Sequence, residues 1–175
     1  MRLFFGLSLP DDVREVTASC AAQAKACIPG RYTLPENHHM TLAFLGEAPE
    51  ERLPDARDVL ARCAEDFPAP KLMLSGFSHF GRRGNGILIL QVKSEPALDA
   101  LHNRLVHALC EAGLPADRGP FSPHITLARH ADVTRGYPVC PHAAFEAGQA
   151  HVFLSARDEA DILRYTPLYT VSFRE

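Results

Sequence analysis

Two short segments of the chain repeat the same polar residues at the same spacing. Residues 39–43 read His-Met-Thr-Leu-Ala, and residues 124–128 read His-Ile-Thr-Leu-Ala. Two histidines that face each other across a cleft can act as acid and base in a single reaction. Threonine hydroxyls beside them can donate hydrogen bonds to phosphate oxygens as negative charge develops there. These residue types suit the cleavage of a phosphodiester or of a cyclic phosphate.

Both segments are expected to be strands, because they are rich in β-branched and apolar residues. Successive side chains of a strand point to opposite faces, so His39 shares a face with Thr41, and His124 with Thr126. If the two strands are neighbours, these four side chains converge on one cleft. The simpler interpretation is two ordinary strands, each with a stray histidine. The repeat extends to the following Leu-Ala, which favours the shared cleft.

Metal-dependent and nucleophilic chemistry have less support in the sequence. No His-x-x-x-His pair is present, and neither motif carries a carboxylate beside its histidine. The Gly-x-Ser-x-Gly pattern of a serine nucleophile is also missing. We therefore expect no metal and no cofactor.

The elements that position the two motifs alternate between strands and helices. Apolar periodicity predicts helices over about 12–27, 50–64 and 95–112, with Asp11 as the cap of the first. Strands are predicted over 3–9, 39–46, 71–80, 86–92, 121–129, 151–155 and 168–173, and an irregular segment over 131–148. Helices among short strands, with the motif occurring twice, indicate two similar α+β lobes related by a pseudo-two-fold axis.

Composition places limits on the partners and the compartment. The net charge of -3 gives no global basic field, so a nucleic acid would have to be held by a local basic patch. The five cysteines contain no Cys-x-x-Cys pair, and we interpret them as reduced core residues of a cytoplasmic protein. The apolar run at 3–7 is too short for a signal peptide, and no stretch is long enough to span a membrane.

The paired motifs and their flanks resemble the two-histidine (2H) phosphoesterase superfamily. More closely, they resemble the bacterial RNA 2′,3′-cyclic phosphodiesterases, also called 2′-5′ RNA ligases, in residues 2–10, 35–47, 120–129 and 164–168. The resemblance implies an α+β, bilobal 2H phosphoesterase-like fold. Two pseudo-symmetric lobes of antiparallel strands would carry helices on the outside and enclose a central cleft. Residues 1–175 would form this single bilobal domain.

The same resemblance implies metal-free hydrolysis of a ribose 2′,3′-cyclic phosphate to a 2′-phosphate. His39 would be the general acid at the leaving 3′ oxygen, and His124 the base that activates water. Thr41, Thr126 and Arg129 would contact the phosphate. In the ligation direction the roles of the histidines reverse. The partners would be RNA ends or nucleotides with a 2′,3′-cyclic phosphate, and we expect a monomer.

Several residues near the motifs have alternative interpretations. On a regular strand Arg129 would point away from His124, so a phosphate contact needs a bulge or a strand end there. By the same alternation His38 faces away from His39, as a backing or surface residue. Candidates for a basic rim and for base stacking are Arg31, Arg82, Arg83, Arg118, Arg164, Phe80 and Tyr165.

Two other functions remain open from the sequence. One is a nucleotide- or RNA-binding module that keeps the fold without turnover. The other is a phosphodiesterase that acts on small cyclic nucleotides. Both histidines and both threonines are present, which favours an active enzyme over the binding module.

Overall fold

The computed structural model describes residues 1–93, 95–117 and 119–174. The strands of this part of the chain are β1 (Arg2–Ser8), β2 (Arg31–Tyr32), β3 (His39–Glu47), β4 (Lys71–Arg82), β5 (Asn85–Lys93), β6 (His124–Ala131), β7 (Ala143–Glu146), β8 (Gln149–Arg157) and β9 (Leu163–Ser172). The helices are α1 (Asp11–Lys25), α2 (Leu53–Ala64) and α3 (Pro96–Glu111), with short 3₁₀ turns η1 (Pro35–Asn37) and η2 (Glu50–Arg52).

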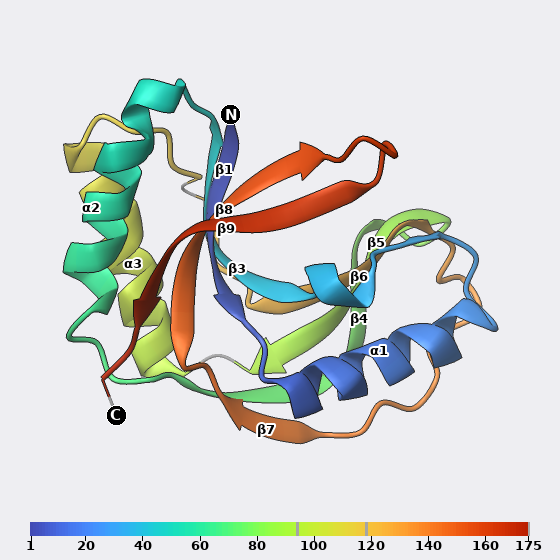
Figure 1. The fold of residues 1–175 in the computed structure, drawn as a ribbon. Coiled ribbons are helices and arrows are strands. Elements are labelled where there is room, and N and C mark those ends of the chain that lie inside the picture. Colours follow the sequence, from blue (N-terminus) through green and yellow to red (C-terminus); the bar gives the residue numbers. More distant parts are fainter. Residues whose placement is uncertain (94, 118, 175) are drawn as a thin grey trace.

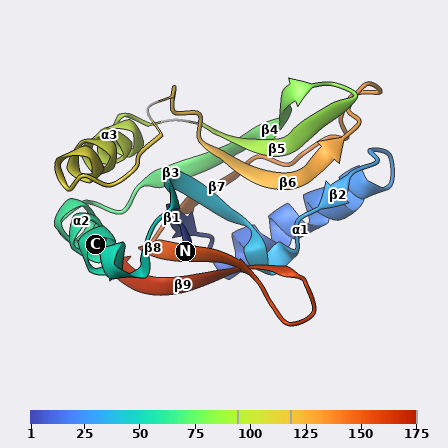
Figure 2. The same ribbon diagram turned by 90° about the horizontal axis from the view of Figure 1, so that it is seen from above.

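Within the described residues the strands form a single sheet in the order β7-β4-β5-β6-β3-β1-β8-β9, and β2 pairs with β6. All the pairings between these strands are antiparallel. β3 and β6 lie at the centre, and each is flanked by its own set of strands. Figure 2 shows β4, β5 and β6 on one side of β3, with β8 and β9 on the other. The predicted α+β fold of antiparallel strands is confirmed.

The helices lie outside the strands, with α2 and α3 on one side of the molecule and α1 on the other (Figure 1). α2 packs against α3 and also contacts β8 and β9, whereas α1 contacts η1, β6 and β7. The buried side of α3 carries Leu98, Leu101, Leu105 and Leu109, which recur every three or four residues, as an amphipathic helix requires. The helices thus bury their apolar stripes without covering the centre of the sheet on its motif face.

Element boundaries differ from the prediction in a few places. Asp11 is the first residue of α1 and not its cap, because the extended Pro10 occupies the capping position. α1 ends at Lys25, so Cys27 lies beyond it and is exposed, whereas Cys20 and Cys63 are buried as expected. The segment predicted to be irregular contains β7. This strand is short and alanine-rich, and its pairing with β4 is a tertiary contact.

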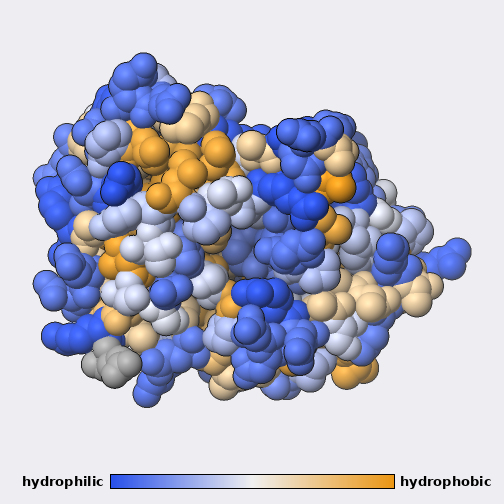
Figure 3. Space-filling view, viewed as in Figure 1, coloured by the Kyte–Doolittle hydropathy of each residue, from blue (hydrophilic) through white to orange (hydrophobic). Residues whose placement is uncertain are grey.

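No helix in the described ranges is long and apolar enough to cross a membrane. The face seen in Figure 3 is mostly hydrophilic, and hydrophobic residues gather on it beside α2, where that helix meets the strands.

Candidate active site

The two repeated motifs lie on adjacent strands at the centre of the sheet. β3 and β6 pair at Met40 and Ile125, the apolar residues that stand between histidine and threonine in each motif. An antiparallel ladder extended by one residue on either side sets each histidine across from the other motif's threonine. The two imidazoles are therefore diagonal neighbours across the strand pair, and the two threonine hydroxyls occupy the other diagonal. One cleft is lined by all four side chains: His39, Thr41, His124 and Thr126.

A β-bulge interrupts each strand just after its threonine. In both motifs the threonine and the alanine lie opposite consecutive residues of the neighbouring strand, so the leucine between them is the extra residue. These leucines, Leu42 and Leu127, are both buried, and so are the alanines that follow them. The Leu-Ala shared by the two motifs therefore corresponds to the same local backbone feature.

Each bulge changes which side chains face the cleft. Without it, Arg129 would share a face with Ile125 and Leu127, away from His124. With the extra residue, the alternation shifts by one position and Arg129 lines the cleft. The bulge in β3 does the same for Phe44, the residue at the corresponding position of the first motif. The cleft therefore receives an arginine from one motif and an aromatic ring from the other.

The imidazoles are held in matching ways. Nδ1 of His39 donates to the carbonyl of Asn37, and Nδ1 of His124 donates to the carbonyl of Ser122, each at 2.7 Å. Since a carbonyl only accepts, both Nδ1 atoms carry the proton and both Nε2 atoms are the free acceptors of the neutral rings. Thr41 Oγ1 lies 3.0 Å from Nε2 of His39 and donates to it. In each ring Nε2 is the nitrogen left available to exchange protons.

Aromatic rings fix the orientation of both imidazoles. Tyr165 of β9 meets the His39 ring edge-on, with centroids 4.9 Å apart and an interplanar angle of 83°. Phe80 of β4 meets the His124 ring in the same way, at 4.8 Å and 84°. Phe4 of β1 also packs on His39, with a centroid distance of 4.8 Å. His39 is therefore enclosed by more aromatic surface than His124.

Burial lowers the pKa of both histidines. For His39 the pKa falls to about 4, chiefly because the surrounding rings desolvate the imidazolium, although part of the ring reaches the cleft surface. The pKa of His124 is also lowered, first by burial and then by the positive charge of Arg129. The carbonyl bonds from Asn37 and Ser122 act in the opposite direction. Both imidazoles are therefore neutral at pH 7 in the empty cleft.

The cleft is large and positively charged. Its volume is about 630 Å³, within the range of small-molecule sites. Among the residues that the structure describes, no aspartate or glutamate lines it, and the arginines that do are Arg2, Arg31, Arg129 and Arg157. This is a local basic surface on a chain whose net charge is -3. It fits an anionic ligand.

A family model described as the 2′-5′ RNA ligase superfamily matches residues 7–161. The chain belongs to this superfamily. The resemblance seen in the paired motifs is thus confirmed over most of the sequence.

Relatives within the superfamily align along about three quarters of the chain or more. The RNA 2′,3′-cyclic phosphodiesterase of Bacillus subtilis (strain 168) is 27% identical over 173 residues, which cover 98% of this chain and 93% of the relative. The protein of the same name from Thermus thermophilus is 32% identical over 135 residues, 74% of this chain and 68% of the relative. Escherichia coli LigT, solved with 3′-AMP, has a TM-score of 0.83 at 27% identity and covers 99% of this chain and 98% of its own.

The structural role of Asn37 was not predicted from the sequence. Its side chain is buried and joins two elements: Nδ2 donates to the carbonyl of Leu163 at 2.7 Å, and Oδ1 accepts from the amide of Tyr165 at 3.2 Å. Its own carbonyl holds His39. Asn37 therefore fixes the imidazole and the ring that packs on it. Its position two residues before the histidine is the only sequence signal.

The arginines predicted to form a basic rim differ in whether they line the cleft. Arg31 lines the cleft with Arg129, whereas Arg82 and Arg83 are not among the lining residues. Arg164 forms ion pairs with Glu36 and Asp158 and does not line the cleft either. Arg118 lies outside the described residues.

His38 takes the backing position expected from strand alternation. It is buried, and its Nδ1 donates to Oγ1 of Thr17 at 2.9 Å, while that hydroxyl donates to the carbonyl of Arg14. Burial lowers its pKa to about 4. His38 thus anchors β3 to α1 and does not face the cleft.

Other residues that line the cleft were not predicted from a sequence motif. Phe44 could have been found by aligning the two motifs, since it stands where the second has Arg129. Arg2 and Arg157 come from the two strands beyond β3, and nothing local marks them. Within the described ranges, no group of three or more histidine, cysteine, aspartate or glutamate residues is arranged to hold a metal ion.

Proposed function

We infer that this chain is an RNA 2′,3′-cyclic phosphodiesterase, a phosphoric diester hydrolase of the 2′-5′ RNA ligase superfamily. The observation that carries the inference is the matched pair of imidazoles. In each ring Nδ1 donates its proton to a backbone carbonyl, and Nε2 is available for proton transfer in the same cleft. Relatives that align along the chain carry the same name.

In the mechanism that we propose, the two Nε2 atoms move protons on opposite sides of one phosphorus atom. His124 accepts a proton from water as the water oxygen bonds to phosphorus. The bond from phosphorus to O3′ breaks, and His39, protonated on Nε2, gives its proton to O3′. The products are a 2′-phosphate and a free 3′-hydroxyl, and one proton has been taken and one returned. The proposed mechanism uses no metal ion.

The remaining cleft groups would stabilise the charge that develops on phosphorus. Thr41 and Thr126 stand beside the imidazoles and can donate to the non-bridging oxygens. Arg129 lines the same cleft, and its positive charge lowers the pKa of both histidines, so the guanidinium lies within electrostatic reach of both rings. Donors fixed in advance by strands need little reorganisation when the phosphate reaches its transition state.

The same groups would support ligation when the incoming nucleophile is not water. A 5′-hydroxyl of a second RNA would attack the cyclic phosphate, O3′ would leave, and a 2′-5′ phosphodiester would form. In this ligation the histidines keep the roles that they have in hydrolysis, unlike the exchange expected above, because O3′ is the leaving group in both reactions. They exchange roles when the 2′-5′ bond is cleaved, as microscopic reversibility requires. We also propose that the protein acts on RNA ends as a cytoplasmic monomer. Within the described residues no disulfide joins any of the five cysteines, which supports a reducing compartment.

Turnover of a nucleoside 2′,3′-cyclic phosphate tests this function directly, with product position assigned by phosphorus NMR. We expect a 2′-phosphate, formed at the same rate with and without EDTA. His39→Ala and His124→Ala should each lower kcat by about two to four orders of magnitude, the usual contribution of a general acid or base.

The matched control is His107→Ala, because His107 is exposed on α3 and pairs only with Glu111 in the described structure. Binding without turnover by the unmodified protein would favour the binding module instead. Loss of activity in EDTA, restored by a divalent ion, would overturn the metal-free mechanism.

A further inference from the structure

Arg31 and Arg129 are direct cross-strand neighbours. In the two-residue strand β2, Arg31 pairs with Arg129 of β6, and both side chains line the cleft. Cβ atoms of such pairs lie about 4.5–5.5 Å apart, and like charges placed there repel each other. Both residues are exposed, so water screens the repulsion while the cleft is empty. An anion between the two guanidinium groups would replace that repulsion with attraction.

No carboxylate of the described residues neutralises this pair. In residues 1–93, 95–117 and 119–174, neither side chain takes part in a hydrogen bond or an ion pair, and no acidic residue lines the cleft. Two other arginines on or near the same surface are paired with carboxylates. Arg157 pairs with Asp161, and Arg164 pairs with Glu36 and Asp158. The Arg31–Arg129 pair is therefore left available to a ligand.

The backbone holds Arg31 firmly in this position. β2 continues along β6 through a bond from the amide of Thr33 to the carbonyl of Leu127 at 2.8 Å. Gly30, the preceding residue, packs so closely on β6 that a Cβ there would lie 3.2 Å from Cα of Ala131. The Tyr32 hydroxyl donates to the carbonyl of Ile28 at 3.0 Å. Arg31 is presented to the cleft by a fixed strand and not by a loose loop.

The charge in the cleft exceeds what the reaction needs. A ribose 2′,3′-cyclic phosphate carries a single negative charge, which Arg129 and the hydroxyls can hold. A 2′,3′-cyclic phosphate marks the 3′ end of an RNA, so any further phosphate of the substrate must lie on the 5′ side of the terminal nucleoside. β2 pairs with β6 beyond the histidines, at Arg129, whereas β3 pairs with it at Ile125. Arg31 thus lies beside the reacting position and not at it.

We propose that Arg31, opposite Arg129, binds the phosphate on the 5′ side of the terminal nucleoside. The pair then distinguishes the end of an RNA strand from a free nucleoside cyclic phosphate. This assignment rests on the proposed function, because it takes the cyclic phosphate to lie between His39 and His124.

The test compares one nucleoside 2′,3′-cyclic phosphate with the same compound carrying a 5′-phosphate. The unmodified protein should have a lower KM for the 5′-phosphorylated compound. Arg31→Gln should raise that KM about ten- to hundredfold, as expected for losing hydrogen bonds to a charged group, and leave kcat unchanged. The compound without the 5′-phosphate should react as before, and Arg31→Lys should restore part of the preference.

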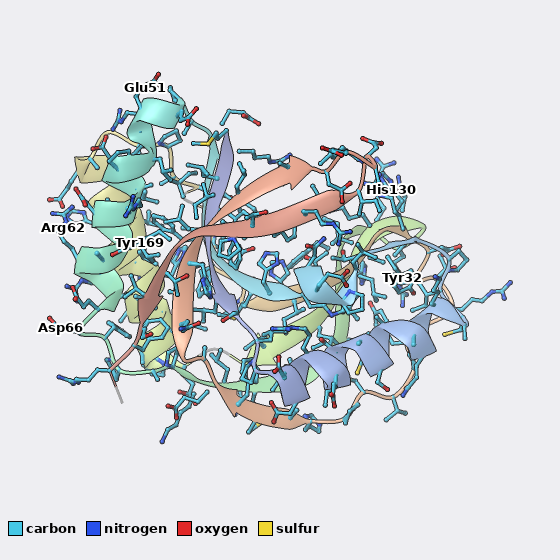
Figure 4. All side chains as sticks on the ribbon, in the orientation of Figure 1. Tyr32, Glu51, Arg62, Asp66, His130 and Tyr169 are labelled. Atoms are coloured by element: carbon cyan, nitrogen blue, oxygen red, sulfur yellow. The ribbon has the colours of Figure 1, made fainter. Side chains whose placement is uncertain are left out.

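Arg62→Gln is the matched control. Arg62 lies on α2, at the opposite end of the molecule from Tyr32 (Figure 4), and it should change neither KM. An equal loss for both compounds with Arg31→Gln would place Arg31 at the reacting phosphate and overturn the proposal. An unchanged preference would overturn it too. If the unmodified protein hydrolysed neither compound, the proposed function itself would fail.

Discussion

At the scale of single residues, the two imidazoles have matching hydrogen bonds but different surroundings. Both donate Nδ1 to a carbonyl two residues upstream, and both meet an aromatic ring edge-on. His39 is also packed against Phe4, which removes more water from it. The pKa of His39 falls to about 4, so the proposed acid is largely unprotonated in the empty cleft at neutral pH. An anionic phosphate beside it would raise that pKa again.

This difference predicts two separate pH profiles. The profile of kcat/KM reports the free enzyme, so its bell should be centred below the ordinary histidine pKa of about 6.5. The profile of kcat reports the complex, where the phosphate charge favours the imidazolium, so it should be displaced to higher pH. The limbs belong to the coupled pair and not to single residues. Coincident bells centred at or above 6.5 would contradict the effect of burial.

At the scale of elements, the site depends on how separate segments are joined. Asn37 links η1 to β9 through Leu163 and Tyr165, and its carbonyl orients His39. β1 approaches the same histidine closely: a Cβ on Gly6 would lie 3.1 Å from the carbonyl oxygen of Met40 and 3.4 Å from Cδ2 of His39. The imidazole is thus placed by η1, which directly precedes β3, and by β1 and β9, which are distant from it in the sequence.

Asn37→Ala tests this linkage. The substitution leaves a partly buried carbonyl and a partly buried amide without their side-chain partner, so the free energy of unfolding should fall by up to about 1–3 kcal/mol per unpaired group. kcat should fall as well, because Tyr165 and His39 lose their common support. Urea unfolding and steady-state kinetics measure the two effects. Asn103→Ala, at an exposed position of α3, is the control and should change little. A variant with normal kcat would show that Asn37 does not position His39.

At the scale of the whole molecule, several buried histidines make the fold sensitive to acid. Burial lowers the pKa of His38 to about 4, that of His39 to about 4, and those of His124 and His151 as well. In the unfolded chain the same groups have pKa values near 6.5. Between these values the unfolded state binds more protons than the folded state. The stabilisation is therefore complete above about pH 6.5 and is lost as the pH falls toward 4.

Urea unfolding at pH 7 and pH 5 should show this loss. The free energy of unfolding should be smaller at pH 5, and His38→Leu should reduce the difference between the two pH values. His38 suits the substitution because it is buried away from the cleft, and its partner Thr17 still donates to Arg14. The shift in the pKa of His38 corresponds to at most about 3 kcal/mol. An identical loss in the variant would mean that other groups cause the acid sensitivity.

The sequence by itself determined the features that depend on local periodicity. Alternation along a strand puts His39 beside Thr41 and turns His38 to the back, and apolar spacing predicts the three helices. The positions of β2 and β7 could not be predicted, because such short strands form only by pairing with β6 and β4. Tertiary structure alone decided which side chains complete the cleft. Bulges set by the ladders with β1 and β5 turn Phe44 and Arg129 inward, since the extra residue depends on the partner strand's hydrogen bonds. The same long-range pairing brings Arg31 to Arg129 and surrounds His39 with rings from β1 and β9, which no local pattern encodes.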